Sequence, residues 1–353
     1  IIVSERVGRI LIQGDLLLEK SGGGEGQPVG CVVLYDDPLP AVCSNFVARV
    51  QTAPDMDSSF WRYAHAAAYA VRLNTRSIKQ TSGIQNLDAS QYFDERVGFP
   101  PLPEQIQIAA FLDRETTKID ALVADQQRLM ELLREKRQTV ISHAVTKGLN
   151  ARAPMKPSCI EWLGNVPAHW GIGRMANVFH EVSDAGNDGL PILSVSIHHG
   201  VSDKEMDEDE MDRKVSRSED RSKYKLVSPG DLVYNMMRAW QGGFGTVTVP
   251  GMVSPAYVVA RPKAQMNTAY VEHLLRTPQA VEQMRRHSRG VTDFRLRLYW
   301  DEFKNLAVLV PPIDEANAIC AEIAEMDKRF NELAEACQQS IDLLQERRTA
   351  LIS

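Results

Sequence analysis

The stretch PPLPEQIQIAAFLDRETTKIDALVADQQRLMELLREKRQTVIS at residues 100–142 decides the fold, because the chain contains a second copy of it. Residues 311–353 read PPIDEANAICAEIAEMDKRFNELAEACQQSIDLLQERRTALIS, without a gap and at an offset of 211 residues. Of the 43 aligned positions 13 are identical, and most of the others keep their polarity. A duplicated segment of this length predicts a duplicated architecture.

Each copy is predicted to form one long helix. A double proline opens each copy and disfavours helix upstream of it. Acids follow the prolines and bases lie toward the end, an order that suits the helix dipole. Apolar side chains recur at spacings of four, seven and three residues, which places them on one face, called here the helix seam. The predicted helix seam consists of Ile108, Leu112, Ile119, Leu122, Leu129, Leu133 and Val140 in the first copy and Ile319, Ile323, Phe330, Leu333, Leu344 and Leu351 in the second.

At 1.5 Å per residue, each helix is roughly 60 Å long. Such a rod cannot bury its apolar face alone, so we expect the two copies to pack on each other. The alternative is an ordinary pair of core helices, which are usually much shorter.

Composition limits the classes that remain. The 353 residues are 44% hydrophobic, enough for two or three domains with real cores. The sequence has no apolar run long enough to span a membrane. Five scattered cysteines without CxxC spacing indicate free thiols in a reducing cytoplasm. The histidines form no metal-ligand pattern, so no metal site is expected.

Charge is distributed unevenly along the chain. The net charge is −6, and nine acids fall within residues 203–220. Residues 221–300, however, carry twelve Lys or Arg against four Asp or Glu. Residues 60–86 carry basic side chains and no acid. Local basic patches, more than total charge, indicate a surface that binds phosphates, although a solvated basic face is the alternative.

The duplication extends upstream of the two helices. GDLLLEKSGGGEG begins at Gly14, and GDLVYNMMRAWQGGFG begins at Gly230. Each predicts a turn, an apolar strand and a glycine-rich loop. VCSNFVARV at 42–50 and VSPAYVVARP at 253–262 follow as further strands, and a basic helical stretch comes next in each half. Each half is therefore predicted to be a mixed α/β globule that leads into a long helix.

At this point the chain resembles a known family, the DNA specificity subunits of type I restriction-modification systems. The resemblance covers nearly the whole chain and is strongest at residues 100–148 and in EWLGNVPAHW at 161–170. It implies a mixed α/β fold with two target-recognition domains joined by two long antiparallel coiled-coil helices that set the spacing of the half-sites. It also implies double-stranded DNA, two adenine-methylating modification subunits and motor-nuclease restriction subunits as partners.

The resemblance suggests five segments. They are a first recognition domain at 1–99, a long helix at 100–148, a linker at 149–160, a second recognition domain at 161–310 and a second long helix at 311–353. Trp162 lies 68 residues before Gly230, whereas only 13 residues precede Gly14. About 55 residues of the second half therefore have no counterpart in the first. We expect the first recognition domain to lack its early strands.

DNA-contacting residues are expected in the glycine-rich loops and the basic segments, because Arg, Lys, Asn and Gln read base edges or hold phosphates. In the second half the candidates are Arg238, Trp240, Gln241, Arg285, Arg286, Arg289, Thr292, Arg295 and Arg297. In the first half they are Lys20, Ser21, Gln27, Arg76, Lys79, Gln80, Gln85 and Asn86. Core packing of Trp240 and a solvated strand edge for Arg295 and Arg297 are the alternatives.

The sequence shows no catalytic motif. It contains no GxxxxGK[ST] phosphate loop, and neither double proline follows the asparagine that adenine methyltransferases require. SGGG at 21–24 lacks the context of a dinucleotide fingerprint, and the acids at 205–212 lack calcium-loop spacing. We expect a DNA-reading subunit that is not itself an enzyme and binds no cofactor. The alternatives are a degenerate scaffold that holds partner subunits without reading DNA, or a recognition module of a fused nuclease-methyltransferase.

Overall fold

The computed structural model describes residues 8–80, 83–186, 189–197, 200–205, 223–290 and 295–353. The chain divides into two compact units. Unit 1 comprises Ile1–Met130 and Ala334–Ser353, and unit 2 comprises Glu131–Leu333. The division passes through both long helices, so each unit is a globular part with a section of each helix. The domain boundaries predicted from the sequence stay a prediction.

Unit 2 is built on a four-stranded antiparallel sheet of order β12-β19-β16-β17, accompanied by the two-stranded pairs β9-β10, β11-β20, β13-β14 and β15-β18. Its strands are β9 (Met155–Pro157), β10 (Asn165–Pro167), β11 (Gly171–Arg174), β12 (Phe179–Val182), β13 (Leu193–Ser196), β14 (Gly200–Glu205), β15 (Lys225–Val227), β16 (Leu232–Asn235), β17 (Phe244–Thr246), β18 (Gly251–Val253), β19 (Tyr257–Pro262) and β20 (Ala307–Val310). Its short helices are α4 (Met175–Val178), η4 (Ala239–Gln241), α5 (Thr268–Leu275), α6 (Pro278–His287) and α7 (Trp300–Phe303). Trp170, Tyr234 and Phe303 are fully buried in its core.

Unit 1 carries a three-stranded sheet of order β4-β2-β6, a second of order β3-β8-β7, and the pair β1-β5. Its strands are β1 (Ile10–Leu11), β2 (Leu16–Glu19), β3 (Ser21–Gly22), β4 (Val32–Leu34), β5 (Ala41–Val42), β6 (Val47–Val50), β7 (Ile78–Gln80) and β8 (Gln85–Leu87). Its short helices are α1 (Ser58–Ala70), η2 (Leu73–Ser77) and α2 (Ala89–Phe93). Asp57 caps α1 by accepting from Phe60 N at 2.8 Å.

The two sheets share one plan, as the sequence repeat predicts. Strands β4-β2-β6 correspond to β17-β16-β19, and unit 2 adds β12 beyond β19. The aspartate of each Gly-Asp turn accepts from a backbone N–H three residues earlier, at 2.8 Å for Asp15 and 2.9 Å for Asp231. The same carboxylates bind Arg49 and Arg261. The duplicated residues therefore form the same ion pair between turn and strand in each unit.

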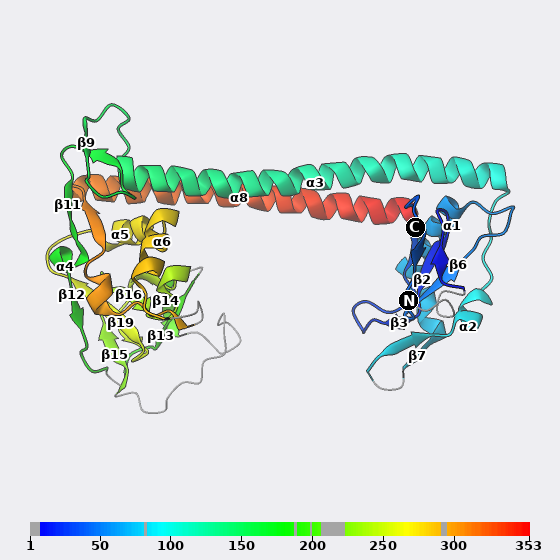
Figure 1. Ribbon diagram of the computed structural model, residues 1–353, viewed down its shortest axis with the longest axis horizontal. Coiled ribbons are helices and arrows are strands. Elements are labelled where there is room, and N and C mark those ends of the chain that lie inside the picture. The colour runs from blue at the N-terminus through cyan, green and yellow to red at the C-terminus, as the bar shows by residue number, and fades with distance from the viewer. Residues whose placement is uncertain (1–7, 81–82, 187–188, 198–199, 206–222, 291–294) are drawn as a thin grey trace. The chain divides into compact units, whose positions relative to one another are not determined.

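The long helices α3 (Leu102–Lys147) and α8 (Ile313–Ile352) run side by side in opposite directions within each unit (Figure 1). In unit 1, Arg348 Nε donates to Asp120 at 2.8 Å. In unit 2, Arg137 Nε donates to Asp327 at 2.7 Å. Partner numbers fall on α8 as they rise on α3, so the pairing is antiparallel. The predicted mixed α/β fold with two long antiparallel helices is confirmed.

The predicted helix seam needs correction at three leucines. Leu122, Leu129 and Leu333 are 49%, 43% and 52% exposed. The inward positions on α3 instead recur in alternating steps of four and three residues, which is the coiled-coil heptad. These positions are Leu112, Thr116, Ile119, Val123, Gln126, Met130 and Leu133. Because one residue turns the helix by about 100°, Leu122 and Leu129 lie beside this face.

The remaining seam positions face inward or partly inward. Ile319 and Ile323 are fully buried on α8, and the seam continues there through Cys337 and Ile341. The other predicted members are half-buried: Ile108, Val140, Phe330, Leu344 and Leu351. Thr116 can occupy the seam because its hydroxyl donates to Leu112 O at 2.7 Å.

The five cysteines are all free thiols, as predicted. Within the described part of the chain, no helix combines the length and the apolar character needed to cross a membrane.

Candidate DNA interface

The glycine-rich loop after β16 doubles back on itself. Asn235 N donates to Gly243 O at 2.8 Å, and Gly243 N donates to Arg238 O at 2.8 Å. Gly242 has a φ of 91°, and a Cβ on Gly243 would lie 2.8 Å from the Cβ of Arg238. Only glycine fits such positions without strain. The loop thereby holds Arg238 and Gln241 side by side, with Arg238 Nη1 donating to Gln241 Oε1 at 3.2 Å.

Helix α6 packs against this loop. Thr277 caps the start of the helix, and Pro278 occupies its first turn. Arg285, Arg286 and His287 lie in the last turn, where cations suit the helix dipole. The guanidinium of Arg285 lies 5.8 Å from the ring centre of Trp240, within cation–π range. Trp240 is half-buried, so it both packs and presents a ring face to an arginine.

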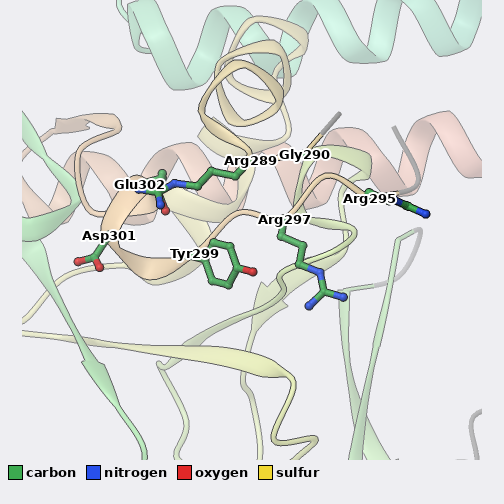
Figure 2. Close-up of a pocket in the computed structure, with 7 residues that line it drawn as sticks. All are labelled: Arg289, Gly290, Arg295, Arg297, Tyr299, Asp301 and Glu302. Atoms are coloured by element: carbon green, nitrogen blue, oxygen red, sulfur yellow. The ribbon is translucent and has the colours of Figure 1, made fainter. Parts of the chain in front are cut away.

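The chain beyond α6 surrounds a hollow of about 760 Å³. Its lining residues come from the end of α6 to the start of α7 (Figure 2): Arg289, Gly290, Arg295, Arg297, Tyr299, Asp301 and Glu302. Arg289 and Arg297 exchange two backbone hydrogen bonds of 2.9 Å. Gly290 has a φ of 153°, and a Cβ there would lie 2.6 Å from Arg295 O. A glycine is therefore required for this close backbone approach.

Carboxylates hold some of these arginine side chains in place. Arg289 forms an ion pair with Glu302, and Arg286 Nε donates to Glu282 at 3.0 Å. Figure 2 shows Arg289 reaching toward Glu302, whereas Arg295 and Arg297 point away from it. A hydrogen bond from Lys304 lowers the pKa of Asp301. The hollow thus presents three guanidinium groups, and that of Arg289 is directed at Glu302.

The loop and the basic segment meet in one site. Leu298 N donates to Met236 O at 2.9 Å, which ties the chain beyond Arg297 to the start of the glycine-rich loop. The predicted candidates of the second half, except Thr292, are thus brought together. Thr292 and the acidic run at 206–220 lie outside the described residues.

In unit 1 the candidates gather on the sheet β3-β8-β7. Ser21 pairs with Asn86, and Asn86 pairs with Lys79, so the three residues form one rung across the sheet. Ser21 Oγ donates to Asn86 Oδ1 at 2.7 Å. Lys79 Nζ donates to Asp88 at 2.6 Å. Because directly opposed residues project to the same side of a sheet, these polar groups share one face.

The other candidates of unit 1 lie on β7, β8 and the adjoining segments and differ in exposure. Gln27 and Gln80 are exposed, Lys20 is half-buried, and exposed Arg76 lies 3.6 Å from Glu95. Gln85 is only 7% exposed, and its Oε1 accepts from Val29 N at 3.2 Å. Its side chain holds the glycine-rich loop and cannot reach a base edge. The assignment of Gln85 to DNA contact is therefore corrected.

Sequence reasoning missed Tyr299 as a site residue. In the structure it lines the hollow and is 40% exposed. An exposed aromatic ring close to arginines is a usual feature of nucleic-acid surfaces.

Nothing among the described residues forms a cluster of three or more metal-ligating side chains. The SGGG stretch places Ser21 and Gly22 in a strand that pairs with β8, so it does not form the strand-to-helix turn of a dinucleotide site.

Comparison with known proteins gives one curated relative and several solved structures. The chain is 24% identical over 307 residues to the type I restriction enzyme EcoBI specificity subunit of Escherichia coli. The match covers 81% of this chain and 62% of that protein, so the chain spans less than two thirds of its relative's length. No protein-family model matches the sequence.

Two solved structures share the fold. One, from work on complex assembly and conformational transition of the type I R-M system, has a TM-score of 0.67 at 13% identity and covers 97% of this chain and 81% of its own. The other, the HsdS subunit from Thermoanaerobacter tengcongensis, has a TM-score of 0.51 at 14% identity, with coverage of 97% and 80%. The resemblance to specificity subunits that the sequence motifs indicated is confirmed.

Proposed function

We propose that this chain, which resembles the type I specificity subunits in sequence and in fold, is the DNA-reading subunit of a type I restriction-modification complex. Each unit reads one half of a bipartite DNA site. The chain itself is not an enzyme, and adenine methylation and DNA cleavage belong to partner subunits.

The site of unit 2 is the observation that carries the proposal. The glycine-rich loop after β16 meets the basic segment of residues 285–297 there, although more than 40 residues separate the two in the sequence. Arg238 and Gln241 have the donors and acceptors that read base edges in the major groove. Arg286, Arg289 and Arg297 are suited to phosphates, which fix the register of a protein on the duplex. A scaffold that does not read DNA would not need this cluster.

Unit 1 offers a smaller version of such a surface. Ser21, Lys79 and Asn86 supply two polar groups and one cation on a single sheet face. Lys79 and Asn86 are exposed, and Ser21 is half-buried. We assign this rung to the first half-site, with Asn86 toward a base and Lys79 toward a phosphate.

Partner subunits are proposed to dock on the long helices. Leu122 and Leu129 lie seven residues apart on α3, on one face, and are 49% and 43% exposed. Leu333 and Leu343 on α8 are 52% and 65% exposed. Apolar side chains left outward along a helix are typical of a protein interaction surface. The face of α3 that carries Leu122 and Leu129 is assigned to the modification subunits.

Salt dependence of DNA binding tests the proposal. Short mixed-sequence duplexes are titrated with the purified chain at increasing salt concentration. Arg286→Ala removes a guanidinium from α6 and should weaken binding. It should also reduce the slope of log K against log salt by about 0.9, the value for one phosphate contact.

Arg329→Ala is the matched control. Arg329 lies on α8, its side chain is 69% exposed against 61% for Arg286, and it likewise pairs with a glutamate four residues earlier. Its removal should leave both affinity and slope unchanged. Equal effects of the two substitutions, or no effect of either, would sink the assignment of the site.

A further inference from the structure

Unit 1 contains an apolar pocket of about 330 Å³ beside α1. Residues that line it include Val50 at the end of β6, Trp61, Ala64 and His65 on α1, and Tyr92 and Val97 beyond. His65 Nδ1 lies 2.8 Å from Tyr92 Oη, and the two rings stack at 5.7 Å. Burial raises the pKa of Tyr92 to about 12 and lowers that of His65, so both groups are neutral near pH 7.

The rim of this pocket is unusually apolar for a surface. Phe93 and Val97 line it and are 49% and 48% exposed, and Phe99, whose ring lies 5.3 Å from that of Trp61, is 48% exposed. Single exposed apolar residues are ordinary, but three around a pocket indicate a surface that is covered by something. Trp61 adds a buried Nε1 donor that finds no acceptor among the described residues.

Unit 2 shows what covers the corresponding surface. Val308, which stands 211 positions after Val97 in the duplicated sequence, is 0% exposed. Its strand β20 pairs with β11. The segment then turns through α4, and Met175 N donates to Leu306 O at 2.9 Å. Met175 and Phe179 from this segment are fully buried in the same core as Val308.

The edges of the two sheets differ in the same way. In unit 2 the outer side of β19 is occupied by β12. In unit 1 the corresponding strand β6 pairs with β2, and among the described residues no strand lies on its other side. A strand with one unpaired edge is a template for an added strand.

We infer that unit 1 has a docking site for a polypeptide segment from outside these 353 residues, of the chemistry of residues 171–182. The segment adds a strand to the free edge of β6. It makes one helical turn and places two apolar side chains, four positions apart as Met175 and Phe179 are, in the pocket. A carbonyl of the added backbone gives Trp61 Nε1 its acceptor. This inference rests on the fold of unit 1 and is independent of the proposed function.

A synthetic peptide of residues 171–182, GIGRMANVFHEV, tests the site. The peptide carries a fluorescent label at its N-terminus, and its anisotropy is followed as the full chain is added. We expect saturable binding. A peptide with Phe179→Asp should not bind, because a carboxylate cannot be desolvated in an apolar pocket without a partner.

Two variants of the chain locate the binding. Ala64→Leu fills part of the pocket and should weaken peptide binding by about tenfold, since overpacking by a few methylenes is resisted. Ala70→Leu, at the exposed end of the same helix, should leave it unchanged. Val97→Lys changes only the exposed rim and should also weaken binding, which keeps the test valid if Ala64→Leu unfolds unit 1.

Three results would overturn the inference. The first is the absence of saturable binding. The second is binding that neither Ala64→Leu nor Val97→Lys affects, which places the peptide elsewhere. The third is self-association of the chain that the pocket variants abolish, seen by analytical ultracentrifugation, which makes a second copy the occupant.

Discussion

The side chain of Asp231 contributes two kinds of interaction at the start of β16. It accepts from Ser228 N at 2.9 Å and binds Arg261 with both oxygens, each at 2.9 Å. Its side chain is 2% exposed, whereas Asp184, the other carboxylate on Arg261, is 56% exposed. Removing a buried carboxylate destabilises far more than removing an exposed one, because its polar partners are left without water to replace it.

Asp231→Ala should therefore lower the free energy of unfolding of unit 2 by about 3 kcal/mol. Asp184→Ala removes a carboxylate from the same arginine at the surface and should cost less than about 1 kcal/mol. Chemical denaturation of the full chain, followed by a probe in unit 2, measures both. Similar losses for the two variants would show that the position of the carboxylate in the turn does not matter.

At the scale of the element, the long helices show how far a sequence pattern reaches. The gapless repeat, the double prolines and the apolar period correctly predicted two long helices. The period did not predict which leucines face inward. Leu122 and Val123 are adjacent in the sequence, and both are apolar. Which of the two faces inward depends on the heptad phase that the partner helix imposes. Thr116 and Gln126 occupy inward positions that a purely apolar pattern passes over.

Ile119 and Leu122 lie on different faces of α3, so substitutions at the two positions distinguish the inward face from the outward one. Ile119→Ala, at a residue 4% exposed, should lower the free energy of unfolding of unit 1 by about 2–4 kcal/mol. Leu122→Ala should change it by less than about 0.5 kcal/mol, since Leu122 is 49% exposed. Under the proposed docking of modification subunits, Leu122→Ala should instead weaken their capture in a pull-down. Unchanged capture with Leu122→Ala and Leu129→Ala together would contradict the docking surface.

At the scale of the whole molecule, the sequence predicted the duplicated plan better than the recognition sites. Gly-Asp turns and their arginines recur in both halves, and in each half they form the same ion pair. The site of unit 2 could be anticipated because its basic residues are dense along the sequence. Gln85 could not be distinguished from a base-reading glutamine, because its burial depends on Val29, 56 residues away. Tyr299 likewise becomes a site residue only through the fold around it.

The paired helices permit a test of spacing. Helix α3 begins in unit 1 and ends in unit 2, and α8 connects the same units in the opposite order. The contacts Asp120–Arg348 and Arg137–Asp327 place the point after Leu129 opposite the point after Ala336. Four residues inserted at both points lengthen each helix by about 6 Å, just over one turn, and keep the seam nearly in phase.

If the helices set the distance between half-sites, the lengthened chain should direct methylation to the same two half-sites with a spacer longer by one or two base pairs, since B-DNA rises about 3.4 Å per base pair. Methylation mapping in cells that supply the modification subunits measures this. Insertion in α3 alone is the control. It shifts α3 against α8 by about one turn beyond the insertion, so Arg137 no longer meets Asp327, and methylation should be lost. New half-site bases at an unchanged spacer would show that the helices do not measure distance, because a ruler changes the interval and leaves the reading surfaces as they are.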